Sequence, residues 1–223
     1  MAQYDKNIKP LIFMGPSISI EESKNILEIE VIIHPPIQRG DLKNIPENTQ
    51  VILIIDGFFY NKRAVSPFEI KDIIERKIYV MGASSMGALR AAELYPLGMK
   101  GIGEVFNMYK YEKITSDADV ALIFDENTLQ PLTEPMINIR YAVMILLQEN
   151  KLSYEEANLI IFMAENIYFP ELTYNRLFID LKNILPTSRI DIISDIIISR
   201  KNEFDIKHKD ACLAIMTLNN LYK

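Results

Sequence analysis

The sequence of 223 residues has few of the side chains from which metal and disulfide sites are built. It contains one cysteine, Cys212, which excludes an internal disulfide and a cysteine-rich metal site. Its only histidines are His34 and His208, and this scarcity argues against a zinc centre. We therefore expect no metal in the functional site.

Long apolar runs and an excess of positive charge are also missing. No apolar stretch approaches the roughly 18 residues that a membrane-spanning helix needs. Residues 1–9 are too polar for a signal peptide, so we expect a cytoplasmic protein with no membrane partner. The formal net charge of −6 argues against nucleic acid as a partner, because binding phosphates requires a clustered basic surface.

Glycine is absent from the C-terminal half, since all eight glycines lie between Gly15 and Gly103. This contrast predicts two architectures in one chain. We expect an α/β fold, with a parallel-sheet βαβ core over residues 1–128 and an all-helical region packed on it over residues 129–223.

Apolar runs and helix-like stretches alternate in the N-terminal part, as is typical of βαβ units. The predicted strands are 11–14, 29–33, 51–55 and 78–81, and 120–124 is a further candidate strand. The predicted helices are 20–27, 67–77 and 86–94. Five more helices are predicted after Pro135, one of them opened by a capping box at 153–156. Because the carboxyl ends of parallel strands share one edge, we expect the polar turns that follow the strands to form one cleft.

The most informative of these turns joins a predicted strand to a helix through two adjacent serines. Ala83, Ser85 and Gly87 have the small-x-Ser-x-small spacing of a nucleophile elbow, in which small neighbours let the backbone bend sharply. Ser85 is therefore the candidate nucleophile, and the alternative is that Ser84 has this role. The alternative is that a serine only caps the helix.

The start of that helix carries candidate anion-binding groups. The backbone N–H groups of Met86 and Gly87 would face an incoming anion. Arg90 and Glu93 lie about one turn further on, where an ion pair between them is the simpler interpretation. The alternative is that Arg90 reaches back toward the anion.

Two earlier turns supply further candidates. In the segment PPIQRGD, Arg39 would be held toward an anion and Asp41 toward a cation or a partner's backbone, and the alternative is a surface turn. Asp56 ends the most apolar strand and either caps a turn or transfers protons. His34 is the only imidazole near the cleft, although a structural role is the alternative, and no complete Ser-His-Asp triad is evident.

Four segments resemble the TfuA-like protein family in order and spacing: PPIQRGD, IDGFFYNKRAVSPFEI, GASSMGALRAAELYPLGMKGIGEVF and LTEPMINIR. The resemblance covers residues 8–140. It implies that the protein works beside a YcaO enzyme, which uses ATP to activate a backbone amide oxygen of a peptide or protein substrate so that sulfide replaces it. We expect ATP on the YcaO partner and no cofactor on this chain, which has no GxxxxGK[ST] loop.

The task that the resemblance implies is to supply sulfide or to recruit its source. Cys212 lies outside the family's segments, so a persulfide relay has no evident carrier. We expect instead hydrolysis of the C-terminal thiocarboxylate of a ubiquitin-like sulfur carrier, with Ser85 attacking the carbonyl carbon or positioning water. Arg39 or Arg90 would then engage the tail, and protons would pass through Asp56, Glu93 or His34.

A non-catalytic adaptor that binds the YcaO enzyme, its peptide or the sulfur carrier is the competing interpretation. An accessory domain that binds nucleotide or phosphate is a third interpretation, suggested by the glycine turns and arginines.

Overall fold

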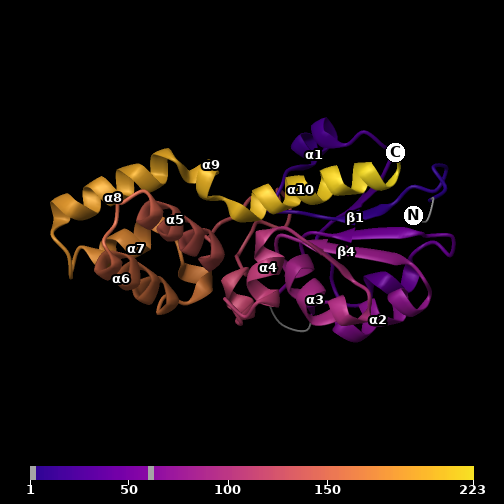
Figure 1. Ribbon diagram of the computed structural model, residues 1–223, viewed down its shortest axis with the longest axis horizontal. Coiled ribbons are helices and arrows are strands. Elements are labelled where there is room, and N and C mark those ends of the chain that lie inside the picture. The colour runs from indigo at the N-terminus through magenta and orange to yellow at the C-terminus, as the bar shows by residue number, and fades with distance from the viewer. Residues whose placement is uncertain (1–3, 60–62) are drawn as a thin grey trace. The chain divides into compact units, whose positions relative to one another are not determined.

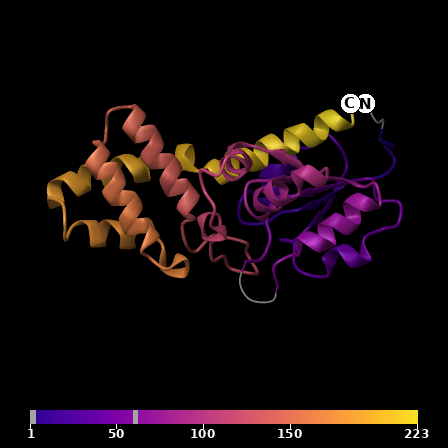
Figure 2. The ribbon, with the colours of Figure 1, turned by 60° about the horizontal axis from the view of Figure 1, so that its bottom comes forward.

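The computed structural model describes residues 4–59 and 63–223. The chain forms two compact units (Figures 1 and 2). The first unit contains Met1–Asp117 together with Lys207–Lys223, and the second contains Ala118–Ile206.

The first unit is built on a parallel sheet of five strands in the order β2-β1-β3-β4-β5. The strands are β1 (Leu11–Phe13), β2 (Ile32–His34), β3 (Val51–Ile54), β4 (Tyr79–Ala83) and β5 (Lys100–Ile102). The predicted α/β class is confirmed. β5 was not predicted, because this edge strand is three residues long and has an exposed lysine and a glycine where a buried strand has apolar residues.

Helices cover both faces of this sheet (Figure 1). α1 (Ile20–Ile26) and α10 (Ile206–Leu221) lie on one face, and α2 (Pro67–Glu75) and α3 (Met86–Leu94) lie on the other. α4 (Glu104–Lys110) packs against α3 and β5, and the short 3-10 helices are η1 (Asp41–Asn44) and η3 (Tyr95–Leu97). Within the described residues, none of the helices is both long and apolar enough to cross a membrane.

The last helix is part of the first unit, whereas its place in the sequence predicted that it belongs to the helical region 129–223. Ala214 and Leu218 of α10 pack in one apolar cluster with Ile12, Leu53 and Met81, which lie side by side on β1, β3 and β4. The chain returns to the sheet because α1 alone does not cover this apolar face, and burying it stabilises the fold.

The second unit is helical. It contains α5 (Met136–Gln148), α6 (Tyr154–Glu165), α7 (Tyr174–Leu181), α8 (Thr187–Ser199), α9 (Lys201–Phe204) and the 3-10 helix η5 (Phe169–Glu171), while the 3-10 helix η4 (Asp117–Asp119) spans the boundary between the units. The capping box predicted at Ser153 and Glu156 is present. The prediction of a strand at 120–124 is wrong, because this segment contributes only an isolated bridge between Phe124 and Pro131.

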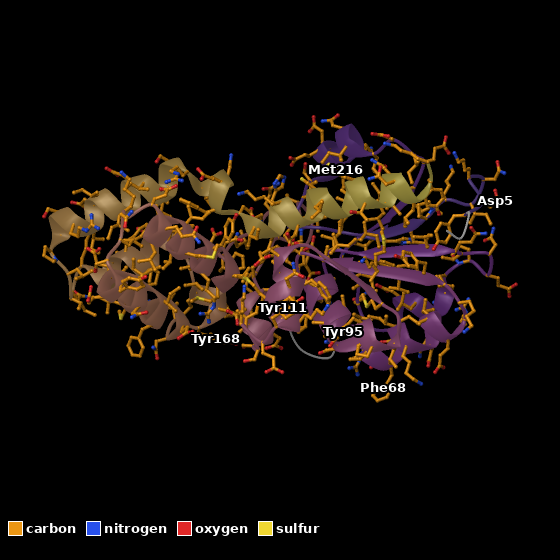
Figure 3. All side chains as sticks on the ribbon, viewed as in Figure 1. Asp5, Phe68, Tyr95, Tyr111, Tyr168 and Met216 are labelled. Atoms are coloured by element: carbon orange, nitrogen blue, oxygen red, sulfur yellow. The ribbon has the colours of Figure 1, made fainter. Side chains whose placement is uncertain are left out.

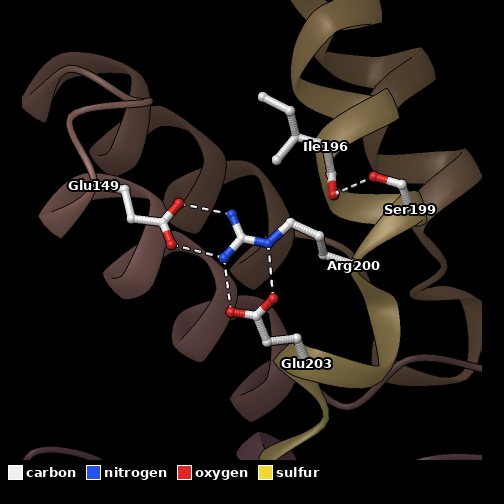
Figure 4. A network of polar contacts seen from close by, with 5 residues as sticks. All are labelled: Glu149, Ile196, Ser199, Arg200 and Glu203. Carbon is white, nitrogen blue, oxygen red and sulfur yellow. Dashed lines mark hydrogen bonds and ion pairs between the residues drawn. The ribbon is translucent and has the colours of Figure 1, made fainter.

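One arginine joins three helices of the second unit (Figure 4). The Arg200 guanidinium donates two hydrogen bonds to Glu149, at 2.6 and 2.7 Å, and two to Glu203, at 2.8 and 2.7 Å. It also lies 4.9 Å from the centre of the Phe204 ring. The Arg200 hydrogen bonds hold the pKa of Glu149 below its usual range. This network ties the end of α5 to the junction of α8 and α9.

Several large apolar side chains of the first unit point outward (Figure 3). Phe68 is 76% exposed on α2, Tyr111 is 66% exposed after α4, and Met216 is 47% exposed on α10. They come from separate elements, and single exposed apolar side chains are ordinary on protein surfaces.

Asp210 anchors α10 to the start of α4. Its carboxylate accepts hydrogen bonds from the backbone N–H groups of Glu104, at 2.9 Å, and Val105, at 2.8 Å. Gly103, with a φ of +93°, leaves the necessary room, because a Cβ there would lie 2.2 Å from the Asp210 carboxyl carbon. Burial raises the pKa of Asp210 to about 6, and the two hydrogen bonds offset only part of that rise.

This raised pKa predicts a pH-dependent stability. The ordinary pKa of an aspartate is 3.8, so a folded-state pKa of about 6 means that folding favours the protonated carboxyl of Asp210. The protonated carboxyl contributes at most about 3 kcal/mol to the free energy of unfolding. This contribution is fully present below pH 3.8 and is lost as the pH rises through about 6. Urea unfolding from about pH 4 to pH 8 should therefore show the stability of the wild type falling relative to Asp210→Asn. Parallel profiles of the two proteins would contradict this prediction.

Candidate functional site

The candidate site lies where the strand order reverses. The chain leaves β1 for β2 on one side and then passes to β3 on the other side. In open parallel sheets, the crevice outside the carboxyl ends of such strands is the usual place for a ligand. The turns after β1 and β3 meet at this point.

The three polar turns predicted to share a cleft are in contact through their backbones. The N–H of Ile37 donates to the carbonyl of Asp56 at 2.9 Å, and the N–H of Phe58 donates back to Ile37 at 3.1 Å. The N–H of Gly87 donates to Ile55 at 3.2 Å. The turns therefore lie together, as the order of the strands requires.

Asp56 is the centre of this arrangement and is 1% exposed. Its Oδ2 accepts hydrogen bonds from the backbone N–H groups of Gly15, at 2.8 Å, and Ser17, at 3.1 Å. Its Oδ1 accepts a hydrogen bond from the Ser17 hydroxyl at 2.6 Å. A carboxylate at the end of β3 thereby fixes the turn that follows β1.

A chain of hydroxyl groups connects Asp56 with the serine turn. The Ser84 hydroxyl donates to the Ser17 hydroxyl oxygen at 2.9 Å, and Ser17 in turn donates to Asp56. The three residues come from the ends of β4, β1 and β3. Such a chain can move a proton from Ser84 to the carboxylate without a histidine.

The sharp bend of the backbone is at Ser84. Ser84 has a φ of +66°, and the N–H of Ser85 donates to the carbonyl of Ala83 at 2.8 Å, which closes a three-residue turn around Ser84. A turn of this kind with a positive φ is rare and strained for a residue other than glycine. Strain of this sort is typical of a nucleophile elbow.

The backbone bend therefore lies at Ser84, whereas the spacing in the sequence favoured Ser85. Ser85 has a φ of −116° and lies at the N-cap position of α3. Its side chain makes no capping hydrogen bond there, so the simple helix-cap interpretation does not describe it either. Gly82 lies two residues before Ser84, and a Cβ there would lie 2.1 Å from the carbonyl oxygen of Gly87.

The two backbone N–H groups predicted to bind an anion, those of Met86 and Gly87, differ in whether they already have an acceptor. The N–H of Gly87 already donates to Ile55, so the structure does not offer it to an oxyanion. Gly87 instead allows a close approach, since a Cβ there would lie 1.9 Å from the Ile54 carbonyl oxygen. Met86 is the first residue of α3, and the first N–H groups of a helix have no acceptor within the helix.

The strain at Ser84 can be measured with two variants that both lack its hydroxyl. We expect Ser84→Gly to be more stable than Ser84→Ala by about 1–2 kcal/mol, because glycine adopts a positive φ without steric cost. Chemical denaturation of both proteins measures the difference. Equal stabilities would show that the bend at Ser84 is not strained.

Both serines are buried, Ser84 at 0% and Ser85 at 2% exposure. A pocket in the described part of the first unit reaches Met86, next to Ser85, and has a volume of about 420 Å³. Its lining residues are Phe59, Ala64, Met86, Leu89, Arg90, Glu93, Thr115, Ser116 and Asp117. A substrate must therefore open a path from this pocket to reach the Ser84 hydroxyl.

Arg90 and Glu93 form the ion pair that the spacing predicted. The Arg90 guanidinium donates from one nitrogen to both oxygens of Glu93 at 2.8 Å, and its Nε donates to the carbonyl of Val65 at 2.9 Å. Both residues also line the pocket that reaches Met86.

Arg39 and Asp41 have different roles in their turn. Arg39 is exposed, and its N–H donates to the carbonyl of Arg63 at 2.7 Å. The Oδ2 of Asp41 accepts a hydrogen bond from the N–H of Gln38 at 2.8 Å, so Asp41 stabilises the turn itself. Arg39 stays a candidate for binding an anionic tail, since its segment pairs with the segment after β3.

His34 does not reach the serines. It ends β2, and its ring stacks on Phe13 with 5.0 Å between the ring centres. β1 and β3 lie between β2 and β4, and three strand spacings amount to about 14 Å. A direct proton transfer between His34 and Ser84 is therefore excluded in this conformation.

Ser17 was not among the site residues predicted from the sequence. The turn Gly15-Pro16-Ser17 after the first strand was the available signal, since polar turns at strand ends are where sites form. Nothing local, however, indicates that Ser17 bridges Ser84 and Asp56, which are 67 and 39 residues away.

The comparisons with known proteins give one family. The family model described as TfuA-like protein matches residues 56–173, which is more than half of the chain. The matched segment contains Asp56, Ser84, Ser85 and Arg90. No curated protein matches the chain.

Proposed function

The chain belongs to the TfuA-like protein family, and from this premise we propose that it is the partner of a YcaO enzyme in forming peptide backbone thioamides. It supplies sulfide by hydrolysing the C-terminal thiocarboxylate of a ubiquitin-like sulfur-carrier protein. The observation that carries the hydrolytic part is the strained Ser84, whose hydroxyl is linked through Ser17 to Asp56.

The chain of hydroxyls accounts for the first step. The Ser84 oxygen adds to the carbonyl carbon of the thiocarboxylate, its proton passes to Ser17, and the Ser17 proton passes to Asp56. The N–H of Met86, at the start of α3, is the group closest in sequence to the elbow that can stabilise the oxyanion.

The second step releases sulfur. The C–S bond breaks, and the proton held on Asp56 returns through Ser17 to the departing sulfur. The carrier's carbonyl carbon is then bound to the Ser84 oxygen as an ester. Water then hydrolyses the ester, giving the carrier carboxylate and the free Ser84 hydroxyl. The overall reaction converts a thiocarboxylate and water into a carboxylate and hydrogen sulfide, so no oxidant or reductant is needed.

The pocket beside α3 provides the approach for the carrier tail. Its volume of about 420 Å³ is within the range of ligand pockets, and Met86 lines it two residues from Ser84. Because Ser84 is fully buried, binding of the tail must widen the path between the pocket and the elbow. Arg39 is the exposed cation of the neighbouring turn and would meet the anionic tail.

A non-catalytic adaptor is the second candidate, and the burial of both serines favours it. An adaptor would bind the YcaO enzyme, its peptide or the sulfur carrier and raise their local concentration. It would require no access to Ser84.

Thioamide formation with excess free sulfide tests the two candidates. A YcaO enzyme, ATP and the peptide substrate are incubated with free sulfide, with and without this protein, and the thioamide is measured by mass spectrometry. If the protein supplies sulfide, thioamide formation should no longer depend on it. If the reaction still requires the protein, the adaptor role is supported and the sulfide-supplying role is rejected.

A further inference from the structure

Three metal-ligating side chains that have no part in the proposed hydrolysis meet between α1 and α10. They are Glu22 of α1 and His208 and Cys212 of α10, and one ligand atom from each lies within 4.8 Å of the others. We propose that Glu22, His208 and Cys212 bind a divalent transition-metal ion of the zinc class. This proposal does not depend on the proposed function.

The Glu22 and Cys212 ligand atoms converge on one nitrogen of the His208 ring. The Nε2 of His208 lies 2.8 Å from Oε1 of Glu22 and 3.6 Å from Sγ of Cys212, whereas Nδ1 is 4.0 Å from the sulfur. In a Cys-His-Glu catalytic triad the thiol and the carboxylate would use opposite ring nitrogens. Here the Nε2 of His208 forms a hydrogen bond with Glu22, and a metal ion bound to that nitrogen would have the carboxylate and the thiolate beside it.

The two distances to the His208 nitrogen are close to those of a tetrahedral site. Zinc bonds of about 2.1 Å to nitrogen or oxygen and 2.3 Å to sulfur place nitrogen and sulfur about 3.6 Å apart and nitrogen and oxygen about 3.4 Å apart. The observed nitrogen–sulfur distance is 3.6 Å, and the Glu22 carboxylate has to move away from the ring by only about half an ångström. The Glu22 side chain is 47% exposed, which leaves it free to make this adjustment.

The scaffold holds the donors in place. His208 and Cys212 are four residues apart on α10 and therefore share one helix face. The backbone N–H of Glu22 donates to the N-cap residue Ser19 at 3.1 Å. Further along α10, the buried Asn219 accepts from the N–H of Glu28 at 3.0 Å and donates to the carbonyl of Ile26 at 2.8 Å. The end of α1 is thereby tied to the helix that carries the other two ligands.

The donor types select the metal. A thiolate, an imidazole and a carboxylate together suit Zn²⁺ or Co²⁺, whereas Mg²⁺ and Ca²⁺ prefer oxygen ligands alone. The side chains of His208 and Glu22 are 33% and 47% exposed, so an ion can enter from solvent and keep water as its fourth ligand.

Cobalt titration of the full-length protein tests the proposal. Chelator-treated, reduced protein is titrated with Co²⁺, and the thiolate-to-cobalt charge-transfer band is followed in the near ultraviolet. We expect one Co²⁺ per chain, displacement by Zn²⁺ and no effect of Mg²⁺. Zn²⁺ should also raise the melting temperature, because a ligand of the folded state stabilises it. Absence of the band, or a stoichiometry well below one, overturns the proposal.

Variants establish which side chains bind the ion. Cys212→Ser should lose the band, and His208→Gln and Glu22→Gln should each weaken binding at least about tenfold. Glu21→Gln is the matched control, because Glu21 is also an exposed glutamate in the first turn of α1. Circular dichroism verifies that each variant is folded. Unchanged affinity in His208→Gln or Glu22→Gln overturns the three-ligand site.

Discussion

Replacing Ser84 with alanine is expected to slow sulfide release from a thiocarboxylated carrier at least about a hundredfold. The hydroxyl is the proposed nucleophile and begins the chain to Asp56, and the loss of such a group costs several kcal/mol of transition-state stabilisation. Sulfide release is measured under single-turnover conditions with excess protein over carrier, which separates the chemical step from binding.

Ser85→Ala is the matched control, since Ser85 is an adjacent buried serine with an ordinary negative φ. We expect Ser85→Ala to retain most of the activity. If both variants release sulfide at the rate of the wild type, Ser84 is not the nucleophile and the adaptor function is favoured. If only Ser85→Ala is inactive, the interpretation based on the bend at Ser84 is wrong.

Replacing Asp56 with alanine is expected to lower the free energy of unfolding by about 4 kcal/mol. The substitution leaves the N–H groups of Gly15 and Ser17 and the Ser17 hydroxyl without their acceptor in a site that is 1% exposed. Each buried unsatisfied donor costs about 1–3 kcal/mol, and partial relaxation of the turn reduces the sum. Urea denaturation followed by circular dichroism measures the change.

Asp41→Ala is the control for the loss of Asp56. Asp41 is also a carboxylate that accepts a backbone N–H, but its hydrogen bond stabilises only its own exposed turn. We expect Asp41→Ala to cost about 1 kcal/mol or less. A similar, small loss in both variants would mean that Asp56 is not the residue that holds the turns together.

Sulfide release by an Asp56→Asn variant connects the two predictions. Asparagine keeps an acceptor oxygen for part of the network but cannot take the proton from Ser17. A folded Asp56→Asn protein with strongly reduced sulfide release would therefore support proton transfer along Ser84, Ser17 and Asp56. Full activity in that variant would leave Asp56 with a structural role only.

Local patterns in the sequence were sufficient to predict most of the secondary structure. Apolar runs ended by glycine, proline and aspartate predicted β1, β3 and β4, and the capping residues predicted the start of α6. These features depend on neighbours in the chain, so they can be read from the sequence. The same holds for the Arg90–Glu93 pair, whose members are three residues apart on one helix. β2 begins three residues later than predicted, because boundaries depend on pairing with β1.

The candidate site could be located only in part from the sequence. The polar turns were identified because strand ends are recognisable, and the family resemblance pointed to the serine turn. The choice of Ser84 over Ser85 depended on which residue takes the positive φ. The small-residue spacing fits Ser85, whereas Ser84 has a small residue, Gly82, only on its N-terminal side and Met86 on the other. Ser17 became a site residue only because β1 lies beside β3, and β3 beside β4.

The return of α10 to the sheet had the largest consequence that no local pattern indicated. It places Asp210 against the start of α4, 105 residues away, and His208 against Glu22, 186 residues away. Counting cysteines and histidines argued against a metal site, yet three different donors meet when two distant helices cover the same apolar face. Residue types and spacing govern what each segment forms, whereas the burial of shared apolar surfaces governs which segments become neighbours.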